Sequence, residues 1–154
     1  MNTLILVMGL PGSGKTTFAR DHIKSDYVFA ADDYFYGDGM EYNFDPSKLK
    51  EAHAQCYSRT EEQLKRVQRL AMLGKIRRTP GVRVVVTNTF TQKWERDPYI
   101  NLAREYNCQL FIVDLYDGGL TDEELVERNV HGVPVEAIVR MRARYERHSF
   151  TQLS

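Results

Sequence analysis

The sequence predicts an α/β domain in which a short parallel sheet of about four strands lies between two layers of helices. Apolar runs of strand length alternate along the chain with stretches in which apolar residues recur at helical spacing. This alternation is typical of parallel strands joined by right-handed crossover helices. The chain has 154 residues, which suits one compact domain, so residues 1–154 are expected to fold as a single unit.

Apolar runs give the expected strands. Thr3–Met8, bounded by Gly9, has the continuous apolar character of a central strand that is buried on both faces. Val82–Val86 is rich in β-branched residues, which favour buried strands. The other two expected strands are Tyr27–Ala31 and Gln109–Leu115.

The segments between these strands carry helix signals. Asp45 followed by Pro46 is a typical helix start, and Gly74 ends the long helix that follows. Thr121 opens another helix as the first residue of a capping box. The remaining helices are expected at about Lys15–Ile23, Trp94–Tyr106 and Pro134–His148, with Trp94 as a buried anchor of its helix.

The turn after the first strand reads Gly9-Leu-Pro-Gly-Ser-Gly-Lys-Thr16, which fits the P-loop spacing G-x-x-x-x-G-K-[ST]. Glycines allow backbone N–H groups to point at phosphate oxygens, and the helix N-terminus adds partial positive charge. Lys15 is expected to reach the β and γ phosphates of ATP or GTP, and Thr16 to bind Mg²⁺. The expected phosphate-binding residues are Gly9, Pro11, Gly12, Ser13, Gly14, Lys15, Thr16 and Thr17. These features predict a P-loop NTPase with a three-layer αβα architecture.

Two further features favour a small kinase. Asp32 and Asp33 end the second strand, at the sheet edge where the P-loop lies, and a carboxylate there suits a general base. Arg128 lies in a segment of about 127–134 whose glycine and proline suit a mobile lid, and an arginine there would offset charge on the transferring phosphoryl group. The alternatives are that the acidic pair only bonds to the turn backbone, and that Arg128 is a solvated cation at its helix end.

Short segments in order along the chain carry a resemblance. They are Met8-Gly-Leu-Pro-Gly-Ser-Gly-Lys-Thr-Thr17, Asp32-Asp-Tyr34, Trp94-Glu-Arg-Asp-Pro-Tyr99, Glu124-Leu-Val-Glu-Arg-Asn129 and Val133-Pro-Val-Glu-Ala-Ile138 with Met141. On these segments nearly the whole chain resembles the kinase domain of phage-type polynucleotide kinases. It also looks like the related P-loop domains of animal ubiquitin-ligase-binding proteins. The resemblance implies that Asp32 is the general base, that Arg128 contacts the donor phosphates, and that ATP phosphorylates a hydroxyl, typically the 5′-hydroxyl of a nucleic acid.

The chain departs from this family at two places, both on the acceptor side. Phe35 stands where the polynucleotide kinases have an arginine that helps to hold the acceptor's phosphate. Thr87-Asn-Thr-Phe90 follows the third strand where the family usually has an aspartate before Thr-Asn, which leaves Thr87 or Asn88 to orient a metal-bound water. The donor half is therefore expected to be intact and the acceptor half altered.

Aromatic and basic residues bear on the acceptor. The aromatic cluster of Tyr34, Phe35, Tyr36, Tyr42 and Phe44 would either stack on a base or pack its loop onto the next helix. Eight residues between Gln63 and Trp94 are basic and none is acidic. The helix that starts at Pro46 would carry most of this stretch, including Arg77 and Arg78, away from the P-loop, which favours a solvated face over a docking surface for a long substrate or a partner site. Arg140 and Arg144, on one face of the last helix, would reach the nucleotide or pair with nearby glutamates.

Composition limits the remaining choices. The formal net charge is zero, so any affinity for nucleic acid must come from a local patch. Two widely spaced cysteines favour a reducing, cytoplasmic setting. The apolar start is too short for a membrane span and lacks the features of a signal peptide, and no membrane partner is expected.

The sequence therefore predicts an ATP- and Mg²⁺-dependent kinase that phosphorylates a hydroxyl of a nucleic acid or nucleotide. The alternatives within the kinase class are a nucleoside monophosphate kinase and a kinase of a hydroxymethylated base in DNA. The alternative from another class is an ATP-binding accessory protein without acceptor chemistry. The oligomeric state is left open.

Overall fold

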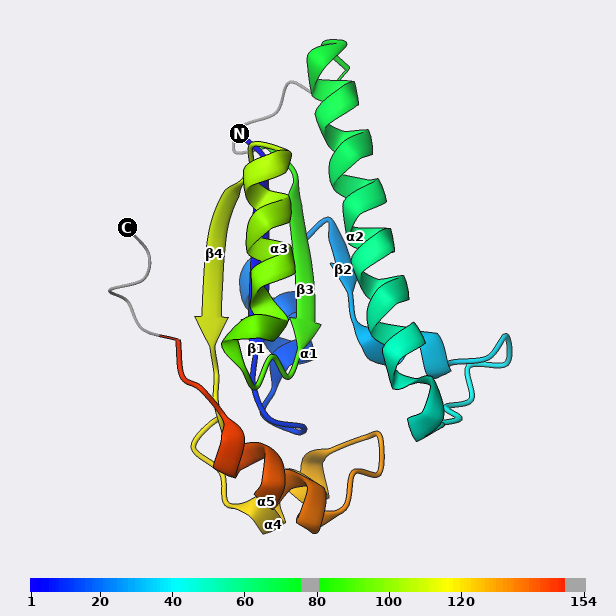
Figure 1. Cartoon of the computed structure of the whole chain (residues 1–154), viewed down its shortest axis with the longest axis vertical. Helices are drawn as coiled ribbons and strands as arrows, with labels where there is room; N and C mark the ends of the chain where they lie inside the picture. The colour runs from blue at the N-terminus through cyan, green and yellow to red at the C-terminus, as the bar shows by residue number, and fades with distance from the viewer. Residues whose placement is uncertain (76–80, 149–154) are drawn as a thin grey trace.

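The computed structural model describes residues 1–75 and 81–148. Four parallel strands form one sheet in the order β2-β3-β1-β4 (Figure 1). Their bounds are β1 Thr3–Met8, β2 Tyr27–Phe29, β3 Arg83–Asn88 and β4 Gln109–Asp114. The α/β fold with a short parallel sheet, predicted from the alternation of apolar runs and helical segments, is confirmed.

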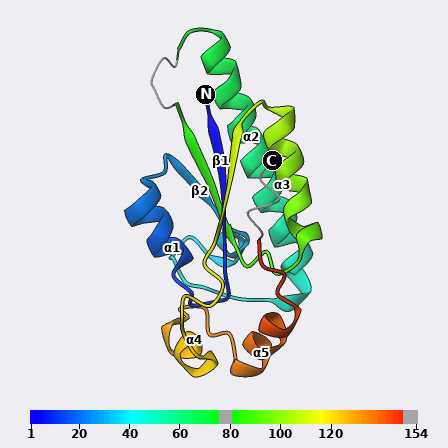
Figure 2. The same cartoon turned by 90° about the vertical axis from the view of Figure 1, so that its left-hand side faces the viewer.

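Helices cover both faces of this sheet. Figure 2 shows α1 on one side and α2 and α3 on the other, with α4 and α5 grouped at one end. The α-helices are α1 Lys15–Phe18, α2 Leu49–Met72, α3 Lys93–Glu105, α4 Asp122–Arg128 and α5 Val135–Arg144. Tighter or wider helical turns are η1 Ala19–Ile23, which extends α1, η2 Ala31–Phe35, and η3 Pro46–Lys48, which leads into α2.

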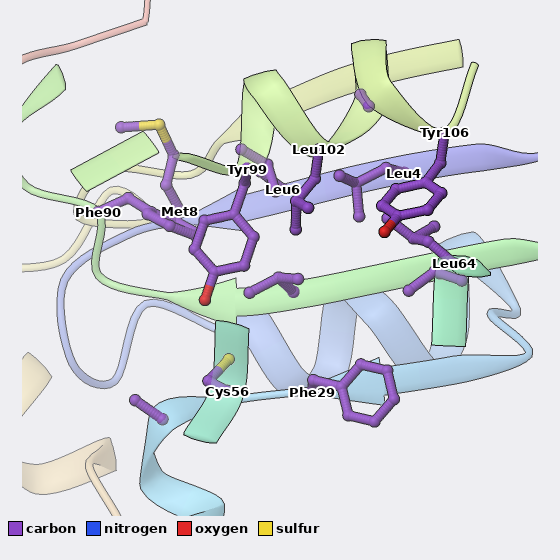
Figure 3. Close-up of a cluster of buried hydrophobic side chains, with 14 of the residues drawn as sticks. Leu4, Leu6, Met8, Phe29, Cys56, Leu64, Phe90, Tyr99, Leu102 and Tyr106 are labelled. Atoms are coloured by element: carbon purple, nitrogen blue, oxygen red, sulfur yellow. The ribbon is translucent and has the colours of Figure 1, made fainter. Parts of the chain in front are cut away.

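The core divides between the two faces of β1 with the two-residue period of a strand. Leu4, Leu6 and Met8 pack with residues of α2 and α3, among them Leu64 and Leu102 (Figure 3). The intervening residues, Ile5 and Val7, pack instead against Ala19 and its neighbours beside α1. A continuous apolar run can thus fill both faces of a parallel sheet, as the sequence predicts for Thr3–Met8.

The carboxyl ends of the strands face α4 and α5, and this edge carries the P-loop (Figure 1). Leu10 of the P-loop packs with Leu125 of α4 and Ile138 of α5 in a separate apolar cluster. The α2 helix runs back along the sheet, so that its last turn lies at the opposite end from α4 and α5 (Figure 1). That course agrees with the expected placement of the basic stretch, although Arg77 and Arg78 lie outside the described residues.

The expectation that Trp94 anchors α3 in the core is wrong. The Trp94 side chain is 67% exposed, and its indole N–H donates to Gln92 Oε1. The buried contacts of α3 come from Tyr99 and Leu102, and Tyr99 lies about 140° around the helix from Trp94. The bulk of an aromatic side chain therefore does not identify the face that packs.

Two element ends also differ from prediction. The second strand stops at Phe29, because the next residues turn into η2, where Asp33 accepts from the Ala30 N–H. The last helix stops at Arg144 instead of reaching His148. Asp114 accepts hydrogen bonds from the Tyr145 hydroxyl and the His148 N–H, which hold the chain after α5 extended against the end of β4. Within the described residues, no helix is both long and apolar enough to cross a bilayer.

Candidate active site

The P-loop has the left-handed backbone conformation that its glycines allow. Gly12 and Gly14 have φ angles of +83° and +100°, a region that other residues rarely adopt. A Cβ on Gly9 would lie 2.3 Å from Ser13 Oγ, and one on Gly12 would lie 2.5 Å from the Leu125 carbonyl oxygen. These glycines therefore allow the loop to fold back on itself and to lie directly against α4.

Lys15 lies over this loop. Its ammonium group donates to the carbonyl oxygens of Gly9, at 2.9 Å, and Leu10, at 3.0 Å. Burial lowers the pKa of Lys15 to about 8, against the opposing effect of the Asp32 carboxylate. The lysine is thus a partly desolvated cation next to the P-loop amides, as phosphate binding requires.

The other predicted phosphate-binding residues follow the loop into α1. Thr16 and Thr17 are exposed in the first turn of α1, and the Thr16 hydroxyl bonds to none of the described residues. Ser13 Oγ is buried and likewise has no hydrogen-bond partner among the described residues. A free hydroxyl at position 16 fits Mg²⁺, which binds through few protein oxygens and keeps phosphate and water ligands. Pro11 and Gly14 complete the set as backbone positions of the loop.

The acidic pair sits on η2, where its two members make different contacts. Tyr42 donates from its hydroxyl to Asp32 Oδ1 at 3.0 Å, and His131 Nδ1 lies 3.2 Å from Asp32 Oδ2. Burial raises the pKa of Asp32, but the hydrogen bonds from His131 and Tyr42, with the charge of Lys15, outweigh burial and hold this pKa below its usual value. Asp32 is therefore ionised near neutral pH, as a general base must be.

Asp33 makes the turn contact that was the alternative for the pair. Its Oδ2 accepts from the Ala30 N–H at 3.0 Å and lies 3.9 Å from Arg59. Burial raises the pKa of Asp33 despite these contacts. Backbone capping is thus the role of Asp33, while the Asp32 carboxylate contacts the side chains of Tyr42 and His131.

Arg128 is not brought into this group. It is the last residue of α4, it is exposed, and it bonds to none of the described residues. The residue of the lid segment that does reach Asp32 is His131. Sequence reasoning missed this role, because a single histidine with no ligand spacing carries no signal by itself. Its place in the predicted lid was the available clue.

The altered acceptor side packs inward. Phe35 is 5% exposed and contacts Tyr34, Tyr42 and Phe44 edge to face. Packing of the loop therefore accounts for part of the aromatic cluster, although Tyr36 and Phe44 remain partly exposed.

The Asn88 side chain stabilises the turn that carries Asp32. Its Oδ1 accepts from the Ala31 N–H at 2.9 Å, and its amide nitrogen lies 3.7 Å from Cys56 Sγ. Asn88 and the buried Thr87 lie at the end of β3. The Asn88 side chain, expected as one candidate to orient a metal-bound water, is thus already engaged with the protein.

Of the two arginines of α5 that were expected near the nucleotide, Arg144 bonds to another described residue and Arg140 to none. Arg144 donates to Thr91 Oγ1 at 3.3 Å, so it contacts neither Lys15 nor Asp32. Arg140 is exposed and has no bond to the described residues. Within the described residues neither Arg140 nor Arg144 pairs with a glutamate, and their reach toward the nucleotide stays a prediction.

Comparison with known proteins identifies the family and the fold. Residues 4–148 match the AAA_33 family model, which describes an AAA domain. Human NEDD4-binding protein 2 is 36% identical to the chain over 148 residues. Those residues are 94% of this chain and 8% of that protein, so the chain corresponds to a small part of the relative.

Solved structures share the fold. The Pnkp1/Rnl/Hen1 RNA repair complex superposes with a TM-score of 0.61 and 20% identity, covering 93% of this chain and 43% of that one. A gluconokinase from Sinorhizobium meliloti 1021 gives 0.52 and 17%, covering 94% and 75%. AvrRxo1-ORF1:-ORF2 with ATP gives 0.52 and 17%, covering 83% and 40%. The chain belongs to the AAA_33 family and has a P-loop kinase-like fold.

Proposed function

We propose that this protein transfers the γ-phosphoryl group of ATP to a hydroxyl group of a nucleic acid or nucleotide. One observation carries the proposal. The ionised carboxylate of Asp32 lies close enough to the P-loop lysine, Lys15, for each charge to influence the other. A phosphate-binding cation and a carboxylate base on one sheet edge are the two groups that phosphoryl transfer to a hydroxyl requires.

In the proposed reaction, the P-loop amides and Lys15 hold the β and γ phosphates. Asp32 accepts the proton of the acceptor hydroxyl as its oxygen forms a bond to the γ phosphorus. The bond between that phosphorus and the β–γ bridging oxygen breaks, and ADP leaves. Mg²⁺ held by Thr16 would neutralise phosphate charge. Arg128 would offset charge on the transferring group if the lid segment brings it inward.

The acceptor is the less constrained part of the proposal. The resemblance of the chain's motifs to the polynucleotide kinases favours the 5′-hydroxyl of a nucleic acid. A nucleoside monophosphate or a hydroxymethylated base in DNA fits the same chemistry.

The proposal also includes a cellular setting. Because Cys56 and Cys108 are both free thiols, a reducing, cytoplasmic setting is part of it.

An ATP-binding accessory role is the second candidate, and specific observations favour it. Phe35 is buried, Asn88 is engaged with Ala31 and Cys56, and Arg128 bonds to none of the described residues. In that case the protein would bind ATP through the same P-loop without an acceptor.

The adjacent carboxylates give a matched test. Asp32→Asn is expected to lower the transfer rate by about 10²- to 10⁴-fold and to change ATP affinity far less, because proton transfer involves only the acceptor, whereas the charge of Asp32 affects ATP binding only indirectly, through Lys15. Asp33→Asn is expected to keep most of the activity, since Asp33 bonds to the Ala30 N–H. Both variants would be assayed with labelled ATP and checked for folding by circular dichroism. Full activity of Asp32→Asn would contradict the assignment of the base.

A further inference from the structure

His131 joins the lid segment to Asp32 and Tyr36, one through each of its ring nitrogens. Nδ1 lies 3.2 Å from Asp32 Oδ2, and Nε2 lies 2.9 Å from the Tyr36 hydroxyl oxygen. The imidazole ring also lies against Tyr42, with 4.4 Å between ring centroids. Histidine, carboxylate and two tyrosines thus form one polar and aromatic cluster over the P-loop edge.

The lid itself holds His131 in place. Its backbone N–H donates to Asn129 Oδ1 at 2.8 Å, and Gly132 follows with a φ of +70°. The Asn129 side chain, next to Arg128, therefore closes a tight turn that presents the histidine to η2. Such a turn fixes the direction of the side chain better than an open loop does.

The proton positions follow from the chemistry of the groups. A carboxylate can only accept, so Nδ1 carries the proton that is shared with Asp32. In the neutral ring Nε2 then accepts from the Tyr36 hydroxyl. Asp32 Oδ1 accepts from Tyr42 at the same time. Each carboxylate oxygen is oriented by one donor and keeps a second lone pair for the acceptor hydroxyl.

We propose that His131 is a positioning residue for the catalytic base: it orients the Asp32 carboxylate and makes that orientation depend on contact between the lid and η2. This inference rests on the proposed function for its catalytic consequence. Its structural content, a His131–Asp32 hydrogen bond that holds the carboxylate, can be measured without any acceptor.

Several charged and titratable groups surround Asp32, and they bear on its titration. Lys15 comes from the P-loop, His131 from the lid, Tyr42 from the loop after η2, and Asp33 from η2 itself. Tyr36 reaches the cluster through His131, and Arg59 of α2 through Asp33. Among the groups that lower the pKa of Asp32, His131 acts through both a hydrogen bond and charge.

Two substitutions separate the nitrogens. His131→Asn places an amide near the former Nδ1 and can keep the bond to Asp32. His131→Gln places its amide near the former Nε2 and loses that bond while keeping reach toward Tyr36. The expected result is a loss in kcat of about 10- to 100-fold for His131→Gln, a much smaller loss for His131→Asn, and unchanged ATP affinity in both.

A pH profile distinguishes orientation from general folding. Because the bond from His131 lowers the pKa of Asp32, its loss raises that pKa, and the acid limb of kcat/KM is expected to move to higher pH in His131→Gln. The same shift is expected in the ¹³C NMR titration of the Asp32 carboxyl carbon, assigned with Asp32→Asn, in protein without substrate.

The NMR titration also separates the two proposals. If the wild type transfers phosphate to no acceptor, the proposed function fails, yet a raised pKa of Asp32 in His131→Gln still supports the positioning role. An unmoved Asp32 titration in His131→Gln would overturn the inference. Equal losses of kcat in the Asn and Gln variants would also overturn it, because they would indicate a structural role for the ring.

Discussion

The lowered pKa of Lys15 makes ATP affinity depend on pH above neutrality. Burial brings this pKa to about 8, and the phosphates of ATP bind the protonated form of the lysine. Raising the pH through 8 therefore deprotonates Lys15 in the free protein. Lys15 must then take up a proton when ATP binds. The affinity is expected to fall as the pH rises, since the bound polyanion raises the pKa of Lys15.

The size of the effect follows from that pKa. At pH 7.5 about a quarter of the lysine is neutral, and at pH 9 about nine-tenths is neutral. The dissociation constant of ATP should then rise about eightfold between these values, which is about 1.2 kcal/mol. In the Mg²⁺ complex of ATP the γ phosphate is already ionised over this interval, so the protein supplies the change.

Isothermal titration calorimetry at pH 7.5 and pH 9, in buffers with different ionisation enthalpies and at saturating Mg²⁺, measures both affinity and proton uptake. Binding at pH 9 should take up close to one proton, and at pH 7.5 only about a quarter of one. The control is Lys15→Met, which has no titrating group and should bind weakly with no pH dependence. Wild-type affinity that stays flat over this interval, or an equal slope in Lys15→Met, would refute the reasoning.

Three further predictions concern the frame around the site. Gly12→Ala should lower the free energy of unfolding by about 1–3 kcal/mol in urea denaturation, because of its positive φ and the close Leu125 carbonyl; an unchanged midpoint would contradict that packing. Burial raises the pKa of Asp114, but bonds led by that from Arg147 outweigh burial and hold it below the usual value. Its stabilisation is therefore present above pH 4 and lost as pH falls through the folded pKa, so Asp114→Asn should cost about 2 kcal/mol at pH 7 and progressively less as the pH falls below 4. Leu102→Ala, in the fully buried face of α3, should cost about 2–5 kcal/mol by thermal denaturation, and a loss below 1 kcal/mol would argue against that burial.

Local sequence signals predicted the elements well where the chemistry is local. The capping box at Thr121 is present, with Thr121 Oγ1 accepting from the Glu124 N–H and Glu124 Oε1 accepting from the Thr121 N–H. Asp45 caps the turn that leads into α2, and Gly74 follows its end with a positive φ. Each of these contacts spans only a few residues, so the residue types and their spacing determine it.

Tertiary contacts were beyond the reach of the sequence. The pairing of Asp32 with His131 joins segments that are far apart in the sequence and meet because α4 and α5 lie at the P-loop edge of the sheet. Trp94 is a second example, because its burial also depends on tertiary contacts. Helical spacing places it on a face, but whether that face is buried depends on the neighbouring strands. The sequence therefore predicted the donor site better than the contacts that surround the base.

Transfer of labelled γ-phosphate from ATP, with Mg²⁺, decides whether the protein is a kinase. The acceptors would be 5′-hydroxyl DNA and RNA oligonucleotides, nucleoside monophosphates and DNA with hydroxymethylated bases, with Lys15→Ala as the blank. Label on one of these acceptors, absent from the blank and strongly reduced in Asp32→Asn, is the predicted result. Label on none of them, from protein that still binds ATP, would contradict the kinase assignment and favour the accessory role.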